Sequence, residues 1–251
     1  MRRILVTFSF LMLVFMALAS VGCKEGTSDS ELDLFMDQIT QLDESAQLPQ
    51  LRELAAAEPP LSVYANYMIG NRFYLEAGET AREVGWNGGE VNALLDSAEV
   101  YFNLAVASDS TFIEAMVNLG SLWDDRSEQM GNRRERDMRV NKAKEFYNMA
   151  LAVNPHDEKA RCNLGALYLR RRETGKALNE FQTVLENDPR SSLAHYNLAI
   201  MFAEQKIYRE ALAEWELAAK YDPDGDIGSR SRENIKIVKE LMNSPVPDAV
   251  K

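Results

Sequence analysis

The feature that most limits the fold of this chain is an internal repeat with a period of 34 residues. Residues 161–189 read RCNLGALYLRRRETGKALNEFQTVLENDP, and residues 195–223 read HYNLAIMFAEQKIYREALAEWELAAKYDP. The matched pairs are Leu164 and Leu198, Gly165 and Ala199, Tyr168 and Phe202, Ala177 and Ala211, Phe181 and Trp215, Val184 and Ala218, and Pro189 and Pro223. A chain that repeats at this interval stacks equivalent units, each of which buries its apolar face against the next.

Each unit is predicted to be a pair of antiparallel helices. Apolar residues follow helical spacing in both halves of residues 161–189. Gly175 lies between the halves and marks the expected turn. The small residue Gly165 is expected where the second helix crosses closely, and the ring of Phe181 is expected to fill the groove beside it. Pro189 follows the second helix, where proline cannot continue it.

The order L-G-x2-Y, A-x3-F and P at this interval resembles the tetratricopeptide repeat family. The resemblance covers roughly residues 61–223. It implies an all-α fold: an α-solenoid of stacked antiparallel helix hairpins that forms a superhelix and ends in a capping helix. The tryptophan expected three residues before the Leu-Gly pair is Arg161 in one unit and His195 in the next. We interpret His195 as a packed or half-exposed helix residue rather than a ligand.

Two longer units precede the regular ones, and a cap follows them. The unit at 111–155 has 11 extra residues, about three helical turns, and a tip expected at Gly131-Asn132. The unit at 61–110 has 16 extra residues and an irregular tip, GWNGG (85–89). The apolar face of the capping helix is predicted to be Ile235, Val238, Leu241 and Met242. The expected organisation is a signal peptide (1–22), a lipidated cysteine and polar tether (23–30), a degenerate hairpin (31–60), four repeats (61–110, 111–155, 156–189 and 190–223), a capping helix (229–243) and a tail (244–251).

The amino terminus is predicted to be an export signal. Arg2 and Arg3 precede an apolar run of 16 residues, shorter than the roughly 20 that a spanning helix needs. Cys23 after small residues resembles a bacterial lipoprotein cleavage site, which implies an acylated first residue and a lipid anchor in the membrane. Ser20 stands where that family prefers leucine, so ordinary cleavage and a retained anchor stay open as alternatives. Lys24 indicates the outer membrane, with the protein facing the periplasm.

Three asparagines recur with the repeat: Asn118, Asn163 and Asn197. In tetratricopeptide solenoids their place on the first helix faces the concave groove. The column resembles the asparagine ladder of the O-linked N-acetylglucosamine transferase superhelix, which grips extended peptide backbone. An amide both donates and accepts hydrogen bonds, so it pairs with a peptide whatever its side chains. The alternative is that these residues are only repeat consensus. Candidates for the two ends of the groove are Tyr64, Tyr67, Tyr74 and Tyr196.

A second candidate surface is a basic edge at the hairpin tips. The net charge of the chain is −11, yet cations gather in two segments that stacked hairpins bring to one edge. They are Arg133, Arg134, Arg136, Arg139, Arg170, Arg171, Arg172 and Lys176. Such an edge suits an acidic protein, lipid headgroups or an anionic glycan. The alternative is a solvated helix face with internal pairs, such as Glu135 with Arg139.

Motifs for catalysis, metals and cofactors are missing from the sequence. There is no Walker loop, Gly-x-Ser-x-Gly or His-Glu-x-x-His, and Cys162 is alone if Cys23 is acylated. The segment DPDGD (222–226) has Ile227 in place of the glycine that a calcium loop requires, so it is interpreted as a turn into the cap. We expect no enzyme, no cofactor and no nucleic-acid partner. The favoured function is a noncatalytic adaptor that binds extended segments of partner proteins, similar in layout to tetratricopeptide lipoproteins of the bacterial envelope.

Overall fold

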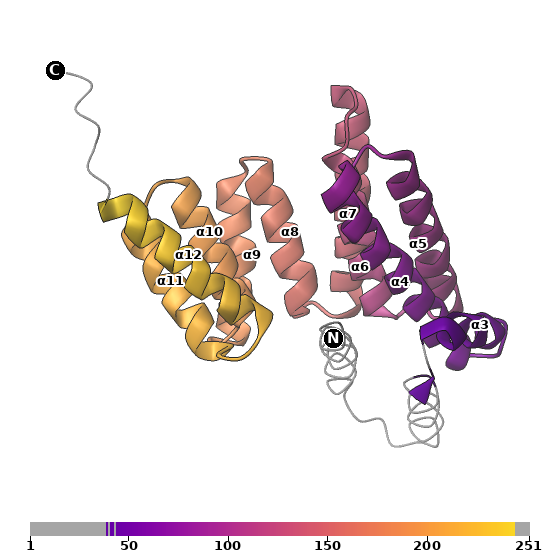
Figure 1. Cartoon of the computed structure of the whole chain (residues 1–251). Helices are drawn as coiled ribbons and strands as arrows, with labels where there is room; N and C mark the ends of the chain where they lie inside the picture. The colour runs from indigo at the N-terminus through magenta and orange to yellow at the C-terminus, as the bar shows by residue number, and fades with distance from the viewer. Residues whose placement is uncertain (1–38, 40, 43, 244–251) are drawn as a thin grey trace, which may run out of the picture.

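The computed structural model describes residues 39, 41–42 and 44–243, which contain ten α-helices and no strand (Figure 1). The helices are α3 Glu44–Leu54, α4 Leu61–Val84, α5 Gly89–Ser108, α6 Ile113–Ser127, α7 Arg133–Val153, α8 Glu158–Arg170, α9 Thr174–Asn187, α10 Ser192–Glu204, α11 Tyr208–Tyr221 and α12 Asp226–Asn243. The predicted all-α solenoid is confirmed. The signal peptide, Cys23, the tether and the tail lie outside the described residues.

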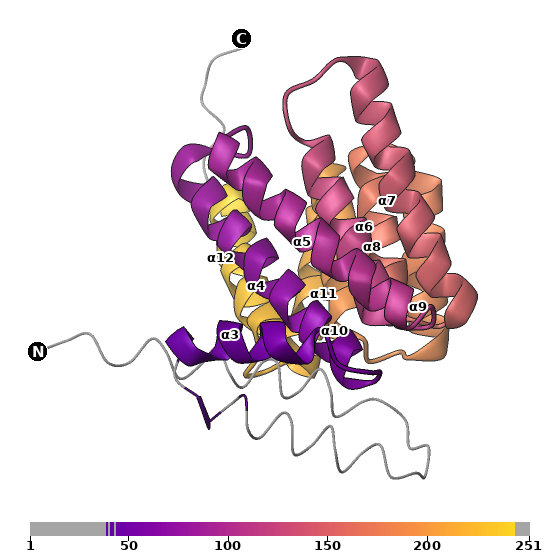
Figure 2. The same cartoon turned by 90° about the vertical axis from the view of Figure 1, so that its right-hand side faces the viewer.

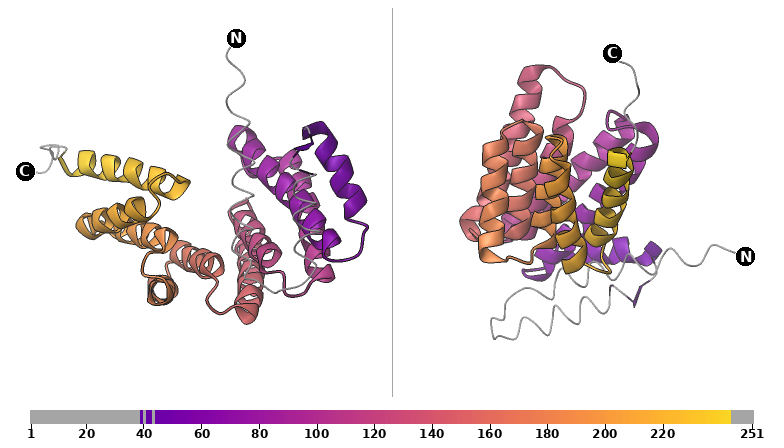
Figure 3. Two further views of the ribbon diagram at one scale, coloured as in Figure 1. Left: turned by 90° about the horizontal axis from the view of Figure 1, so that it is seen from below. Right: turned by 90° about the vertical axis from the view of Figure 1, so that its left-hand side faces the viewer.

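The helices form four antiparallel pairs: α4–α5, α6–α7, α8–α9 and α10–α11. Helix α3 packs on α4 at one end, and α12 packs on α11 at the other. The first helices α4, α6, α8 and α10 also contact one another in order, so the pairs follow a curved path (Figure 3). Of the hairpin expected at 31–60, the described part is essentially α3 and the segment that joins it to α4.

In three of the four pairs, a glycine lets the two helices cross closely. A Cβ atom placed on Gly70, Gly120 or Gly165 would lie within 2.4–2.7 Å of a ring of the partner helix. The rings are Phe102, Tyr147 and Phe181 respectively. All three rings are at most 1% exposed, so they cannot move aside without opening the core. The close crossing expected at Gly165 therefore occurs in three of the four pairs, while Ala199 and Trp215 occupy the matching places in the last pair.

The turn inside the regular hairpins differs from the prediction. Gly175 lies in the first turn of α9, with open space around it. The left-handed residue is Arg172, with φ of 60°, and Lys206 has φ of 63° one repeat later. The amide of Glu173 donates to the carbonyl of Tyr168 at 2.9 Å, which closes the carboxyl end of α8. The assignment of the turn to glycine was wrong because this helix-ending hydrogen bond, and not the glycine, sets the reversal.

The two lengthened hairpins support each other at their tips. The α6–α7 hairpin stands higher than the pairs that follow it (Figures 1 and 2). Gln129 at its tip donates to the Trp86 carbonyl and to Asn92 Oδ1, both at 2.9 Å, and the Met130 amide donates to Asn87 Oδ1 at 2.6 Å. Asn132 then starts α7 with a capping box that uses Glu135. The insertions at 61–110 and 111–155 are thus parts of one contact.

The cap is covered less than its sequence pattern predicts. Val238 is buried and Ile235 half-buried, but Leu241 and Met242 are 54% and 53% exposed. Helix α12 has 18 residues and α11 has 14, a difference of about 6 Å along the axis, so the last turn of α12 has less surface to pack against. Asp222 Oδ2 accepts a hydrogen bond from the Gly228 amide at 2.9 Å, which forms the turn into this helix.

A polar clamp occupies the position where the family places tryptophan. Arg161 of α8 donates to the Pro155 carbonyl and to Glu180 Oε2, both at 2.7 Å. One repeat later, the ring nitrogens of His195 lie 2.6 Å from Glu214 Oε2 and 3.2 Å from the Pro189 carbonyl. Each clamp ties a first helix to the second helix of its pair and to the preceding turn.

The His195 clamp is expected to make stability depend on pH. Burial acts to lower the pKa of His195, but the hydrogen bonds to Glu214 and the Pro189 carbonyl outweigh it, so the pKa is raised above its usual value. A raised folded-state pKa adds stability that is fully present below the unfolded value of about 6.5 and is lost as pH rises through the folded value. Urea unfolding should therefore show that Glu214→Gln destabilises most at low pH, with a gap to wild type that narrows as pH rises.

The matched control for this prediction is Glu180→Gln, one repeat earlier. Its partner Arg161 stays charged throughout, so the loss of stability should be nearly constant between about pH 5.5 and 8.5. Parallel pH profiles for the two variants would show that proton binding by His195 plays no part in holding α10 to α11.

Candidate functional site

The three asparagines of the sequence column lie half-buried on α6, α8 and α10. Asn118 Nδ2 donates to Asn71 Oδ1 of α4 at 2.5 Å, and Asn163 Nδ2 donates to Ser121 Oγ of α6 at 3.2 Å. Asn71 and Ser121 both directly follow the small residue of their own first helix. The amides therefore form a polar ladder that joins successive first helices, a role that the sequence reasoning did not include.

The ladder stops at the last pair. Ala166 occupies the acceptor position on α8, so Asn197 Nδ2 turns to the Leu193 carbonyl of its own helix at 2.9 Å. Within the described residues, the Oδ1 atoms of Asn118, Asn163 and Asn197 accept no hydrogen bond. These three oxygens are therefore the acceptors of the column that have no hydrogen-bond partner among the described residues.

The tyrosines expected at the groove ends are largely used in packing. Tyr64 and Tyr67 contact Phe112 edge-to-face, with ring centroids 5.5 and 5.1 Å apart. The hydroxyl of Tyr196 accepts a hydrogen bond from Asn234 of α12 at 3.4 Å, and the Arg230 guanidinium lies 5.1 Å from the Tyr196 ring. The capping helix thus contacts Tyr196, which is half-buried.

A pocket of about 250 Å³ adjoins the ladder at Asn163. We call it the α4–α6–α8 pocket, and it is lined by Tyr74, Ser121, Asp124, Asp125, Tyr147, Asn163, Ala166 and Arg170. Tyr74 donates its hydroxyl to Asp125 Oδ2 at 2.5 Å, and Tyr147 donates to Ser121 Oγ at 3.3 Å. Arg170 forms an ion pair with Asp124 Oδ2. The sequence assigned Arg170 to the basic edge, but its guanidinium turns into this pocket.

Two neighbouring carboxylates dominate the electrostatics of the pocket. Burial raises the pKa of Asp124 to about 7, although the charge of Arg170 acts to lower it, and the charges of Asp125 and Glu128 raise it further. Burial also raises the pKa of Asp125, while the hydrogen bond from Tyr74 lowers it. Close to neutral pH, Asp124 is therefore partly protonated, because burial disfavours its charged form more than Arg170 stabilises it.

The sequence did carry a signal for this pocket. In the internal alignment, Asp124 occupies the same place as Leu169 and Ala203 of the regular repeats. Asp124 is only 7% exposed, and Leu169 is likewise buried. A carboxylate at a position that the repeat otherwise fills with an apolar residue is costly to bury. Such a residue indicates a site, but the repeat pattern does not reveal it because the residue does not recur.

The basic edge is mostly paired within the protein. Its two clusters adjoin, because Arg133 and Arg171 both contact Asp137, at 3.7 and 2.7 Å. Lys176 pairs with Glu173 at 2.5 Å. Arg139 donates to the Arg126 carbonyl at 2.9 Å, not to Glu135 as expected, because Glu135 closes the capping box of α7. The edge therefore agrees better with the alternative of a solvated face with internal pairs.

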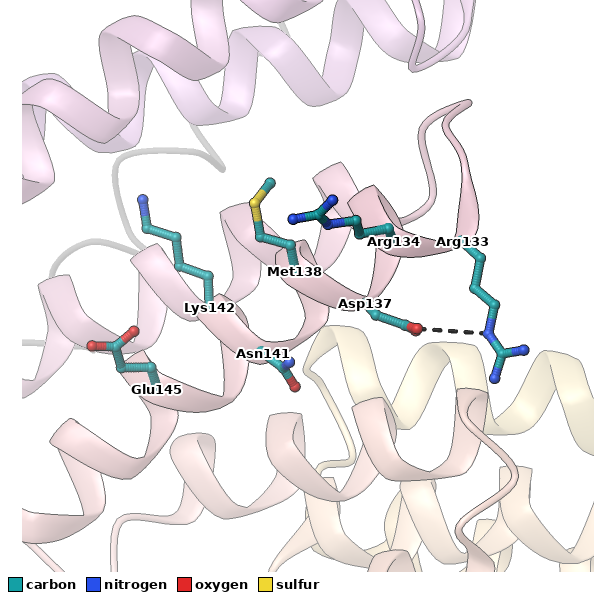
Figure 4. A pocket seen from close by; sticks show the side chains of 7 residues that line it. All are labelled: Arg133, Arg134, Asp137, Met138, Asn141, Lys142 and Glu145. Atoms are coloured by element: carbon teal, nitrogen blue, oxygen red, sulfur yellow. Dashed lines mark ion pairs between the residues drawn. The ribbon is translucent and has the colours of Figure 1, made fainter.

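A shallow hollow runs along α7 within this edge (Figure 4). Its lining residues are Arg133, Arg134, Asp137, Met138, Asn141, Lys142 and Glu145. All come from one helix, and Lys142 is bonded to Glu99 of α5 at 3.3 Å. The hollow is the surface of a single helix, whereas four helices enclose the α4–α6–α8 pocket.

Other candidate chemistry is sparse in the part of the chain that the structure describes. No cluster of three or more His, Cys, Asp or Glu side chains there has the placement for a metal ion. Cys162 is fully buried, and burial raises the pKa of its thiol far above the usual range. None of the helices from α3 to α12 combines the length and apolar character needed to cross a bilayer.

Comparisons with known proteins concern the fold. No family model matches the sequence, and no curated protein matches it. A thermophilic TPR protein of Thermus thermophilus is similar in structure, with a TM-score of 0.60 and 18% identity over 78% of this chain and 91% of that chain. A tetratricopeptide repeat protein of Parabacteroides merdae has a TM-score of 0.52 and 20% identity, over 86% of this chain and 75% of that chain.

Proposed function

We propose that this chain, which has the tetratricopeptide-repeat fold, is a noncatalytic scaffold that binds an extended segment of a partner protein on its first helices. The observation that carries the proposal is the set of open amide oxygens of Asn118, Asn163 and Asn197 on successive first helices. Peptide N–H groups are the matching donors, and backbone pairing of this kind accepts many side chains. The polar α4–α6–α8 pocket lies beside the middle amide and offers a place for one side chain of the segment.

We further propose that the scaffold is exported and held on a membrane by lipid at Cys23. The basis is the sequence alone: a charged start, a short apolar run, small residues and a cysteine. The polar residues 24–30 would then separate the lipid from the first helices. Outer-membrane attachment facing the periplasm follows from Lys24 and belongs to the same proposal. Binding of an anionic surface at the basic edge is less well supported, because four of its eight cations already pair with acidic side chains.

Replacing all three asparagines with alanine is expected to weaken peptide binding by at least about tenfold. Each lost hydrogen bond costs roughly 0.5–1.5 kcal/mol, and three such losses exceed the 1.4 kcal/mol that corresponds to a factor of ten. A peptide would be selected from a random display library on the full chain, and its Kd measured by fluorescence anisotropy. Thermal unfolding must accompany the measurement, because Asn118 and Asn163 also join first helices.

The comparison variant carries Arg133, Arg134, Arg171 and Arg172 all replaced by glutamate. Groove binding should survive this change and should tolerate salt, whereas binding at the edge would weaken as salt rises. If the folded asparagine variant keeps full affinity while the charge-reversed variant loses it, the groove proposal is wrong and the basic edge is the binding surface.

A further inference from the structure

We propose that the α4–α6–α8 pocket binds a primary alkylammonium group, supplied by a lysine side chain of the bound partner segment. The inference rests on the proposed function, since it names the side chain that the scaffold selects. It differs from the asparagine column, which contacts backbone and selects no side chain. Three properties of the pocket favour such a ligand: its remaining acceptors, the arrangement of those acceptors, and its shortage of positive charge.

Apart from the guanidinium of Arg170, which is bonded to Asp124, the hydrogen-bond donors of the pocket are largely directed into the protein. The hydroxyls of Tyr74 and Tyr147 donate hydrogen bonds to Asp125 and Ser121 respectively. The Ser121 hydroxyl in turn donates to the Val117 carbonyl at 3.1 Å. One N–H of the Asn163 amide goes to Ser121. Oxygen acceptors are left over: Asp125 Oδ1 and Asn163 Oδ1 receive no hydrogen bond within the described residues. A complementary ligand is therefore a donor.

The buried carboxylate provides an independent observation. The side chain of Asp124 is only 9% exposed, and its Oδ1 atom is covered and has no hydrogen-bond partner among the described residues. A buried oxygen without a donor is costly and indicates a missing positive partner or a proton. Arg170 is the one cation in the pocket lining that balances the carboxylates of Asp124 and Asp125, and its own side chain is 43% exposed. The pocket therefore favours a ligand that carries a positive charge.

The geometry of the acceptors favours ammonium over guanidinium. One oxygen of each carboxylate is already taken, Asp124 Oδ2 by Arg170 and Asp125 Oδ2 by Tyr74. A planar guanidinium binds best to both oxygens of one carboxylate. An ammonium group has three independently directed donors and suits single oxygens from different residues. The pocket thus fits the head of a lysine better than that of an arginine.

A bound cation should compete with the proton on Asp124. The charged and titratable groups that face Asp124 are Asp125 and Glu128 of α6, Arg170 of α8 and the hydroxyls of Tyr74 and Tyr147. With a pKa of about 7, Asp124 is ionised in roughly a tenth of molecules at pH 6 and in most at pH 8. Lysine stays charged across this range, so its affinity should rise about tenfold from pH 6 to pH 8.

The test uses the full chain in mild detergent and four probes, with dissociation constants from saturation-transfer NMR. Three are blocked pentapeptides of glycine with lysine, norleucine or glutamate in the centre, and the fourth is n-butylamine. The lysine peptide should bind at least about tenfold more tightly than the other two peptides, because only it forms the ion pair. It should also bind more tightly than n-butylamine, which has the same head and no backbone.

The variants Asp124→Asn and Asp125→Asn keep size and shape and should each weaken the lysine peptide about tenfold. Asp124→Asn should also remove the pH dependence. Asp137→Asn on α7 is the matched control, an exposed carboxylate that should leave affinity unchanged. Equal binding of norleucine and lysine, or full affinity in folded Asp125→Asn, would overturn the lysine site. Binding of n-butylamine as strong as that of the peptide would assign the pocket to free amines. The scaffold proposal survives either result, because the asparagine variant tests it separately.

Discussion

Replacing Gly120 with alanine is expected to lower the free energy of unfolding by about 1–3 kcal/mol, the usual cost of overpacking a core. The new Cβ would lie 2.4 Å from the ring of Tyr147. That ring is 1% exposed, and its hydroxyl is bonded to Ser121, so moving it away from α6 would disrupt both its packing and this hydrogen bond. The strain would push α7 away from α6 and also disturb the α4–α6–α8 pocket, which Tyr147 lines. Urea unfolding followed by circular dichroism measures the loss.

Gly78→Ala is the matched control on the same chain. Gly78 lies inside α4, and a Cβ there would meet no atom within 4 Å. Alanine is favoured over glycine in a helix by about 1 kcal/mol, so this variant should be as stable as wild type or more so. Both variants carry the same chemical change, and only the closeness of the partner helix differs. If they shift stability equally, the glycine–aromatic crossing does not explain the pairing of the helices.

The fold was predictable because the residues that pack the two helices of a pair together occupy equivalent positions in successive repeats. Small residues at Gly120 and Gly165 and aromatics at Tyr147 and Phe181 occupy equivalent places in successive repeats, and each recurrence strengthens the next. The contact between the two long tips was not predictable. It depends on hydrogen bonds from Gln129 and Met130, which occur once and follow no period. The error at Gly175 has a different cause: the left-handed residues Arg172 and Lys206 do recur, but they are not residue types that favour a positive φ.

In the candidate site, too, the features that follow the repeat were predictable and the others were not. The sequence placed Asn118, Asn163 and Asn197 on successive first helices, because a period fixes which residues share a face. It could not show that two of these amides are bonded to the preceding helix, because the acceptors Asn71 and Ser121 are different residue types. Arg170 looked like one more cation of the hairpin tip. Only the three-dimensional arrangement brings it to Asp124, an aspartate that does not recur at the equivalent position of the other repeats.

Cys23→Ala is expected to change the location of nearly all of the protein. If the thiol carries lipid, the wild-type chain should be in the membrane fraction and should be released by detergent. Each buried methylene of a lipid adds about 0.8 kcal/mol of membrane affinity, so loss of the chains is decisive for attachment. The variant cannot be acylated at this position. It should therefore be either a soluble chain or an unprocessed precursor that keeps residues 1–22.

Intact-mass spectrometry must accompany the fractionation, because the uncleaved apolar run can itself hold a precursor on the membrane. The lipoprotein proposal requires a wild-type mass equal to residues 23–251 plus lipid, and a variant without lipid. Ser20→Leu is the informative companion, since it restores the residue that lipoprotein cleavage sites favour and should increase processing without changing the mature chain. A wild-type chain that lacks lipid and fractionates like Cys23→Ala would refute the anchor. The groove and its lysine pocket would then have to act on a scaffold without a lipid tether.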